Sequence, residues 1–389
     1  MNLSKEEYAL NLIERCKGVK GVWASTGRYN NQCWTRDFCL TICPLLLLGS
    51  RSRSRSGSGS QQSDINLAKK HLGEIIKRQK PDGKIPILYL DDEKKFLRNK
   101  IEKALEQKTM SFMLSRYLDD ELENLTPHTR DSEVLFIIAI DQLVKTLEKQ
   151  NDCLDPDLDP DLDIFINSAA KAARHALEYV KTILKDGLIH GADWRDTRED
   201  LNDKAVLTNA CYLYKAYKIF NLDDEAEKVK EILKRDYWNG TYFRDYPGSD
   251  GFDILGNSLT VLYDITTEDQ MNSIFEYAME NLSTPYGFKM TETFLPALNA
   301  KENEVMRRDA AVIWPFIGGF LLSSMITKGG KKWYCIASKE FDKWEKLEGF
   351  NEWYCIVEGG GYGSQDQIWS AALYLRVKQN LIDYAHQLK

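Results

Sequence analysis

The sequence predicts an all-α fold, a six-hairpin helical toroid in which an outer ring of helices walls an inner one. Apolar residues recur at helical spacing from end to end, as at Val134, Ile137, Ile138 and Leu143. Stretches that alternate apolar and polar residues as strands do are scarce, and no strand–helix alternation predicts a parallel sheet. The sequence has no fixed-period repeat, which disfavours a solenoid.

Twelve segments carry the helical pattern. They cover residues 5–17, 33–48, 64–79, 131–149, 163–184, 203–220, 223–236, 256–263, 267–282, 309–327, 331–346 and 364–378. Several begin well, because Asp163, Asp203 and Thr267 can each accept a hydrogen bond from free backbone N–H groups. Glu268 and Asp269 then place negative charge in a first turn, where the helix dipole favours it.

Two breaks of biased composition interrupt the helices of this chain, whose 389 residues can bury a large core. Residues 49–62, GSRSRSRSGSGSQQ, are expected to form a disordered Arg/Ser/Gly-rich surface loop rather than a phosphorylated or RNA-binding tract. Residues 151–163 form an acidic, proline-punctuated connector, and solvated charge is favoured there over a calcium site. Because the helical pattern continues on both sides of each break, we expect residues 1–389 to form a single domain.

Charge and cysteine usage exclude several classes of partner. The net charge of −7 disfavours a nucleic-acid surface, since phosphate contacts need clustered Lys and Arg. No run approaches the roughly 18–20 apolar residues of a membrane span, and we expect no signal peptide before Lys5. The eight cysteines include no CxxC pair, and with five histidines they disfavour a zinc site. We expect free thiols in a cytoplasmic protein that contacts no membrane.

Four polar stretches stand at predicted helix starts or in loops, where a toroid gathers its site. In the first, YNNQCWTRDF, Trp34 precedes Arg36 and Asp37 just as an apolar helix begins. An adjacent Arg and Asp can grip vicinal hydroxyls, the Arg donating and the Asp accepting, or they can cap the helix as an ion pair. In the second, HTRDSE, Asp131 opens a very apolar helix, and a capping role is favoured for it if the motif stands alone.

The third stretch, GLIHGADWRDTRED, brings two acids and a tryptophan into one short turn. It contains Asp193, Trp194, Arg195 and Asp196 in succession. A carboxyl group against a tryptophan face loses hydration and has its pKa raised, which is the condition that a general acid needs near neutrality. The competing interpretation is a surface loop of cancelling charges.

The fourth stretch covers residues 350–375, where a carboxylate among aromatic residues leads through a glycine-rich hinge into an amphipathic helix. Glu352 stands between Asn351 and the pair Trp353-Tyr354. A carboxylate on a loop beside an aromatic wall can act as a base, and the alternative is a rim Glu paired with a Lys. The glycines of GGGYG let the backbone turn tightly against a ligand or a neighbouring helix.

Two carboxylates that are distant in sequence and stand beside tryptophan match the needs of glycoside hydrolysis. One acid protonates the leaving oxygen while the other activates a water. A separation of about 6.5–9.5 Å between them predicts inversion at the anomeric carbon, and about 5–5.5 Å predicts retention.

Six short motifs occur along the chain in the order of a known family. They are YNNQ with RDF at residues 29–38, DSEVL at 131–135, GNSL with TEDQ at 256–270, IWP at 313–315, NEWY at 351–354 and QIWS at 367–370. These motifs resemble segments of the neutral and alkaline invertases, which are glycoside hydrolases with an (α/α)6 barrel. Trehalases and amylo-α-1,6-glucosidases are the wider relatives. The likeness spans nearly the whole chain.

The resemblance implies a catalytic (α/α)6 barrel that cleaves a sucrose-like or α-glucosidic bond with inversion, with Glu352 as the base. Asp193 aligns with the acid of the family's Ile-Asp-Arg-Arg, and Asp196 is the alternative proton donor. The residues expected to hold the sugar are Trp34, Arg36, Asp37, Asp131, Trp194, Arg195, Trp314, Gln367 and Trp369. No metal or organic cofactor is expected, because an acid, a base and water suffice.

Departures from the family pattern alter the expected pocket wall. Cys33 and Trp34 replace aliphatic residues, Glu133 replaces a glycine, and Cys355 stands where the invertases have an acid. These changes bear on sucrose specificity rather than on glycosidase chemistry.

Two other kinds of protein remain as alternatives. One is a catalytically inactive carbohydrate-binding toroid. The other is a helical-toroid cyclase or prenyl transferase, which needs a zinc set or an Asp-rich metal box that LDDEL at residues 118–122 is too short to supply. The expected ligand is a small saccharide, and the sequence leaves a homo-oligomer open.

Overall fold

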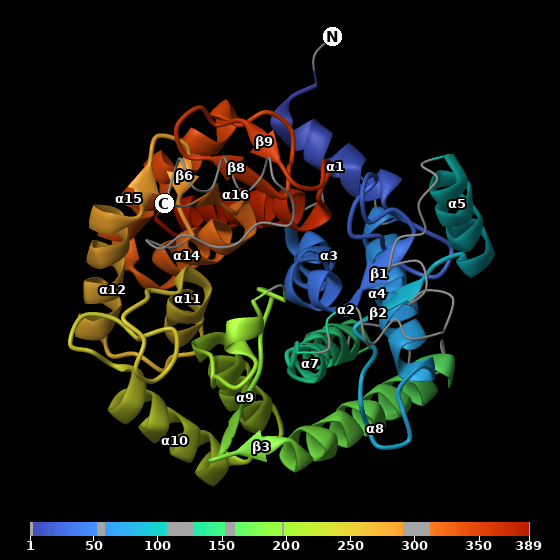
Figure 1. Ribbon diagram of the computed structural model, residues 1–389, viewed down its shortest axis with the longest axis horizontal. Coiled ribbons are helices and arrows are strands. Elements are labelled where there is room, and N and C mark those ends of the chain that lie inside the picture. Colours follow the sequence, from blue (N-terminus) through green and yellow to red (C-terminus); the bar gives the residue numbers. More distant parts are fainter. Residues whose placement is uncertain are drawn as a thin grey trace.

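The computed structural model describes residues 3–52, 59–106, 126, 128–151, 160–196, 198–290 and 312–388. Within these residues the chain is mostly helical, and its helices form two concentric rings (Figure 1). The predicted all-α (α/α)6 barrel is therefore confirmed.

The inner ring of the described structure is closed. Its helices are α3 (Cys43–Ser52), α7 (Ser132–Asn151), α9 (Leu207–Ile219), α11 (Ile254–Leu262), α14 (Pro315–Lys328) and α16 (Ile368–Gln387). Each packs against the next, and α16 packs against α3 to complete the circle (Figure 1). A short helix α2 (Thr35–Asp37) and a π-helix η1 (Phe38–Ile42) lead into α3.

The outer ring covers the inner one. Its helices are α1 (Lys5–Arg15), α4 (Gly59–Lys77), α8 (Pro160–Thr182), α10 (Asp223–Ile232), α12 (Glu268–Asn281) and α15 (Gly330–Asp342). They pack in turn against α16, α3, α7, α9, α11 and α14. Because outer and inner helices alternate along the chain, the inner helices all begin at the same end of the barrel.

The apolar content of a helix explains whether it lies in the inner or the outer ring. Every residue of α14 from Pro315 to Ile326 is buried, as expected for a helix that is packed on all sides. By contrast, α10 buries only Ala226 and Val229 and turns its charged residues outward. Burial of the inner ring on both faces thus fixes the two-layer architecture.

Short antiparallel strands pair in the loops between the helices. Strand β1 (Gln32–Trp34) pairs with β2 (Leu88–Leu90), β3 (Leu184–Lys185) with β4 (Leu188–Ile189), and β5 (Ser283–Thr284) with β6 (Gly287–Phe288). A three-stranded sheet joins β7 (Val312–Ile313), β8 (Trp353–Cys355) and β9 (Gly361–Tyr362). The remaining short helical turns are η3 (Glu199–Leu201), η4 (Leu233–Tyr237) and η5 (Lys343–Lys346).

Several helix boundaries differ from the prediction. Thr267 caps α12 in a capping box with Gln270, as expected. Asp203 does not cap its helix: α9 begins at Leu207, because residue 205 pairs with Gly191 in a bridge. The helix predicted from residue 309 begins at Pro315, since Val312 and Ile313 pair with β8. Helix α8 starts three residues before Asp163, and helix α5 (Glu93–Glu106) was not predicted.

The two biased breaks lie partly outside the described residues. Helix α3 extends to Ser52 and α4 begins at Gly59, so residues 49–52 and 59–62, expected in the loop, are helical instead. Residues 53–58, the connector residues 152–159 and the stretch 118–122 are not among the described residues. Of the helices that are described, none has the length and apolar character to cross a membrane. The cytoplasmic location stays a prediction.

Candidate active site

The candidate site gathers where the inner helices begin. Arg36 and Asp37 lie in α2, Asp131 directly precedes α7, and Gln367 is the N-cap residue of α16. Backbone hydrogen bonds join the loops that lead into different helices. The Arg130 N–H donates to the Ala192 carbonyl over 2.9 Å, which ties the loop before α7 to the loop before α9.

Glu352 is held at this end of the barrel by two donors. Its Oε1 accepts a hydrogen bond from the Tyr29 hydroxyl at 3.2 Å, and its Oε2 accepts one from the Ser364 N–H at 2.7 Å. The residue is 8% exposed. Burial raises the pKa of Glu352 above its ordinary value, and the hydrogen bond from Ser364 is the largest opposing effect.

A glycine makes room for the Glu352 carboxylate. Gly363 has φ of +72°, in the left-handed region that favours glycine. A Cβ at this position would lie 2.5 Å from Glu352 Oε2. The glycine-rich hinge predicted from sequence therefore turns the backbone against the carboxylate, which lets the Ser364 N–H reach it.

Arg36 bridges two carboxylates from different loops. Its Nε donates to Asp131 Oδ2 at 2.6 Å, and its Nη1 donates to Asp196 Oδ2 at 3.3 Å. The guanidinium thus faces these two acids, and a grip of Arg36 and Asp37 on vicinal hydroxyls stays a prediction. Burial raises the pKa of Asp131 and of Asp196, and in both the attraction of Arg36 opposes the rise.

Asp193 belongs to a buried ion-pair network. It is 0% exposed, and both of its oxygens accept hydrogen bonds from Arg195 at 2.9 Å. Thr208 donates to Asp193 as well, and Arg195 reaches on to Asp245 at 2.6 and 2.8 Å. Burial alone would raise the pKa of Asp193, but the charge of Arg195 and the hydrogen bonds outweigh it, so the pKa lies below its ordinary value. These contacts favour a structural role for Asp193 and Arg195 over the predicted chemical ones.

Asp37 and Gln367 meet near Arg36 and Glu352. Gln367 Nε2 donates to Asp37 Oδ1 at 3.3 Å, and both residues are buried. Gln367 Oε1 has no hydrogen-bond partner among the described residues. Burial raises the pKa of Asp37 to about 7, against the attraction of Arg36.

Three tryptophans and a phenylalanine form an aromatic wall. The ring centroids of Trp194 and Trp314 lie 5.2 Å apart, and those of Trp314 and Trp369 lie 5.9 Å apart. Phe316 stacks on Trp369 at 4.2 Å. The indole N–H groups of all three tryptophans are buried without a hydrogen-bond partner among the described residues. Unpaired buried donors on a wall of π faces are suited to a polar ligand with apolar faces, such as a sugar ring.

Tyr29 lies among the acidic groups, and the sequence prediction placed it in a site motif but gave it no role of its own. Its ring lies edge-on to Trp34 at 6.0 Å, while the indole of Trp34 donates to Gln32 at 3.0 Å. Burial raises the pKa of Tyr29, and Glu352 and Asp196 raise it further. Glu352 and Asp196 therefore lie close enough to act on the same hydroxyl. The YNNQ motif contains this tyrosine, but its spacing gives no sign of a hydrogen bond to residue 352.

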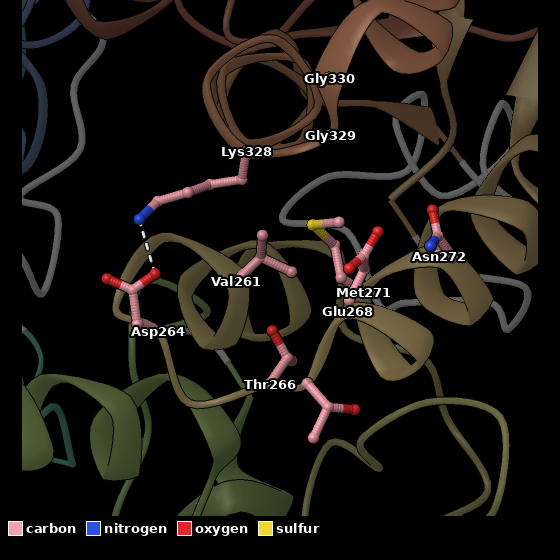
Figure 2. A pocket seen from close by; sticks show the side chains of 10 residues that line it. Val261, Asp264, Thr266, Glu268, Met271, Asn272, Lys328, Gly329 and Gly330 are labelled. Carbon is pink, nitrogen blue, oxygen red and sulfur yellow. Dashed lines mark hydrogen bonds and ion pairs between the residues drawn. The ribbon is translucent and has the colours of Figure 1, made fainter.

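The described residues contain no group of three or more His, Cys, Asp or Glu side chains placed to hold a metal ion. A pocket of about 400 Å³ lies apart from the candidate site residues (Figure 2). Its lining includes Val261, Asp264, Met271 and Lys328, with an ion pair of 2.6 Å between Lys328 and Asp264. Val261 and Lys328 lie at the C-terminal ends of α11 and α14, so this pocket is at the other end of the barrel from the candidate site.

Fold and site together define an (α/α)6 barrel whose inner helices present buried carboxylates beside an aromatic wall. Neither a protein-family model nor a curated protein matches the sequence. Solved structures do match the fold, and glycosidases are among them.

An uncharacterized conserved protein from Thermus thermophilus superposes with a TM-score of 0.63 at 12% identity, over 96% of this chain and 99% of that one. The GH63 mannosylglycerate hydrolase from the same organism, in complex with glucose, gives 0.62 at 12% identity, over 95% and 98%. A glycosidase variant in complex with glucose gives 0.61 at 11% identity, over 97% and 96%. At these identities the likeness shows a shared fold along nearly the whole length.

Proposed function

We propose that this chain is a glycoside hydrolase that cleaves a small saccharide with inversion, using Asp196 as the acid and Glu352 as the base. The observation that carries the proposal is that these carboxylates, from loops more than 150 residues apart, lie close enough to act electrostatically on each other and on Tyr29. The glycosidases that share the fold support it.

Asp196 suits the acid better than Asp193. A proton donor must hold a proton near neutrality and release it toward the ligand. The side chain of Asp196 is 23% exposed and its pKa is raised, mainly by burial. The Asp193 carboxylate is enclosed and its pKa is lowered by Arg195 and its hydrogen bonds despite burial, so it has neither property.

Glu352 suits the base. Hydrogen bonds from Tyr29 and Ser364 favour its charged form and fix the orientation of the carboxylate. In the proposed reaction Asp196 protonates the glycosidic oxygen as the bond from that oxygen to the anomeric carbon breaks. Glu352 removes a proton from a water, whose oxygen bonds to the same carbon from the opposite face.

The sugar contacts of the proposal fall to groups with unused hydrogen-bonding capacity. Trp194, Trp314 and Trp369 supply indole donors and apolar faces, while Asp131 Oδ1 and Gln367 Oε1 supply acceptors. Asp37 would accept from a hydroxyl beside Gln367, and Trp34 would extend the aromatic surface near Tyr29. Arg36 and Arg195 would act by holding carboxylates in place rather than by gripping hydroxyls.

For the substrate we propose an α-linked glucoside or a sucrose-like disaccharide. The invertase-like motifs point to this class, and two of the glycosidases with this fold are in complex with glucose. A catalytically inactive sugar-binding protein is the alternative.

Incubation with a panel of α-linked di- and trisaccharides tests the proposal. We expect release of a monosaccharide, and proton NMR in the first minutes should show the β-anomer of the glucose freed from an α-glucoside. Release of the α-anomer first would refute inversion. Binding of a saccharide without any release, measured by calorimetry, would favour the inactive alternative.

A further inference from the structure

The Arg36 guanidinium poses a difficulty for an acid placed beside it. A positive charge favours the ionised form of a neighbouring carboxyl group and lowers its pKa by about 1–3 units. Asp196 accepts a hydrogen bond from Arg36, yet it must retain a proton until the leaving oxygen needs it. Something must therefore reduce the effect of Arg36 on Asp196.

Asp131 is placed to do this. Its Oδ2 lies 2.6 Å from Arg36 Nε, whereas Asp196 Oδ2 lies 3.3 Å from Nη1. The side chains of Asp131 and Arg36 are 1% and 5% exposed, so their attraction is little screened by water. Both bonds are charge-assisted, and the negative charge of Asp131, on the shorter one, offsets much of the positive field that Arg36 exerts at Asp196.

We propose that Asp131 is a positioning residue that neutralises Arg36 and thereby leaves Asp196 able to hold the proton for the leaving group, an inference that rests on the proposed role of Asp196. Burial lowers the pKa of Arg36, but Asp131 and then Asp196 raise it to a net value above the ordinary one. That order agrees with the distances.

Other titratable groups surround this trio. They are Tyr29, Asp37, Cys39, Glu133, Asp193, Tyr212 and Glu352. The acids among them have hydrogen-bond partners of their own: Gln367 for Asp37, the Ile85 N–H for Glu133, Arg195 for Asp193, and Tyr29 for Glu352. The hydrogen bonds described for Arg36 lead to Asp131 and Asp196, so Asp131 is the acid whose charge most directly offsets that of Arg36 beside Asp196.

The test is a carboxyl titration of the full chain carrying ¹³C at the aspartate side-chain carboxyl groups, in which the Asp196 resonance is identified by its loss in D196N. In D131N we expect the Asp196 midpoint to fall by about one pH unit or more, because Arg36 then acts on Asp196 alone. D131E, which keeps the charge, should stay near wild type. E133Q, which removes a buried acid two residues away, should also leave the midpoint unchanged.

An unchanged or higher Asp196 midpoint in D131N would overturn the inference. If D131N does not fold, R36Q replaces it: its Asp196 midpoint should rise, and an unchanged one would show that Arg36 has no effect to be neutralised. The titration needs no substrate. A midpoint that shifts in a protein that cleaves no saccharide would therefore support the charge sharing and contradict the proposed function.

Where the protein hydrolyses a saccharide, the alkaline limb of kcat/KM against pH should move to lower pH in D131N by the same amount. A rise in KM with an unmoved limb would mean that Asp131 only binds substrate, and would overturn the positioning role.

Discussion

At the scale of single residues, Asp193 and Asp196 show how one turn can hold two acids with different tasks. Both carboxylate oxygens of Asp193 accept hydrogen bonds from Arg195, which also donates to Asp245. Asp196 keeps a partly exposed side chain and accepts a hydrogen bond from Arg36. Asp193 thus fixes the turn to the rest of the structure, while Asp196 stays partly exposed.

Asp193→Asn should lower stability more than it alters chemistry. Because Arg195 and Asp193 are both buried, loss of the charge leaves a guanidinium under-compensated, at a cost of about 3 kcal/mol in the free energy of unfolding. D200N is the matched control, since Asp200 is 55% exposed and pairs with Arg198 at the surface, and it should cost less than about 0.5 kcal/mol.

Urea unfolding of both variants measures this, together with turnover at a temperature where each is folded. The folded D193N protein should retain far more turnover than D196N. Wild-type stability combined with abolished turnover in D193N would instead make Asp193 the acid.

The choice between these acids could not be made from the sequence. The stretch ADWRD shows two carboxyl groups beside a tryptophan, but both are next to Arg195 in the chain. Which one the guanidinium holds depends on Thr208 and Asp245, and these come from other parts of the chain. The same limit applies to Arg36, whose partners lie 95 and 160 residues away.

At the scale of elements, the turn between β9 and α16 decides where Glu352 sits. Gly363 follows β9 directly, and its left-handed backbone brings the Ser364 N–H onto the carboxylate. The sequence predicted the glycine hinge and the helix after it. It did not predict strands β7, β8 and β9, because two- and three-residue strands leave too few positions for an alternating pattern.

Gly363→Ala should displace the base. An added Cβ would stand 2.5 Å from Glu352 Oε2, and the left-handed backbone costs about 1–2 kcal/mol for an alanine. We expect turnover to fall at least tenfold with a small loss of thermal stability.

Gly360→Ala is the matched control, because the nearest contact of its Cβ would be an ordinary 3.4 Å to the Glu358 side chain. It should behave as wild type in both turnover and melting temperature. Wild-type turnover in G363A would show that the position of Glu352 does not depend on this glycine.

At the scale of the whole molecule, closure of the barrel brings residues that are far apart in the sequence into one site. The ring closes by packing α16 on α3, so the residues near position 30 meet those near position 360. This was foreseeable in outline, because the segments that form α7, α9 and α14 are long and rich in apolar residues. The exact residues at which the helices begin could not be predicted. They depend on contacts such as the bridge between Gly191 and Ala205, which the local sequence pattern does not show.

The most direct test of the central claim is the turnover of D196N and E352Q on the saccharide that the panel identifies. Each should fall by about 10²–10⁴-fold with an unchanged melting temperature, because each removes one proton-transfer step. D203N and E358Q, which alter exposed acids in the same two loops, should turn over as wild type. Near-wild-type turnover in D196N or E352Q, or an equal loss in the controls, would contradict the account.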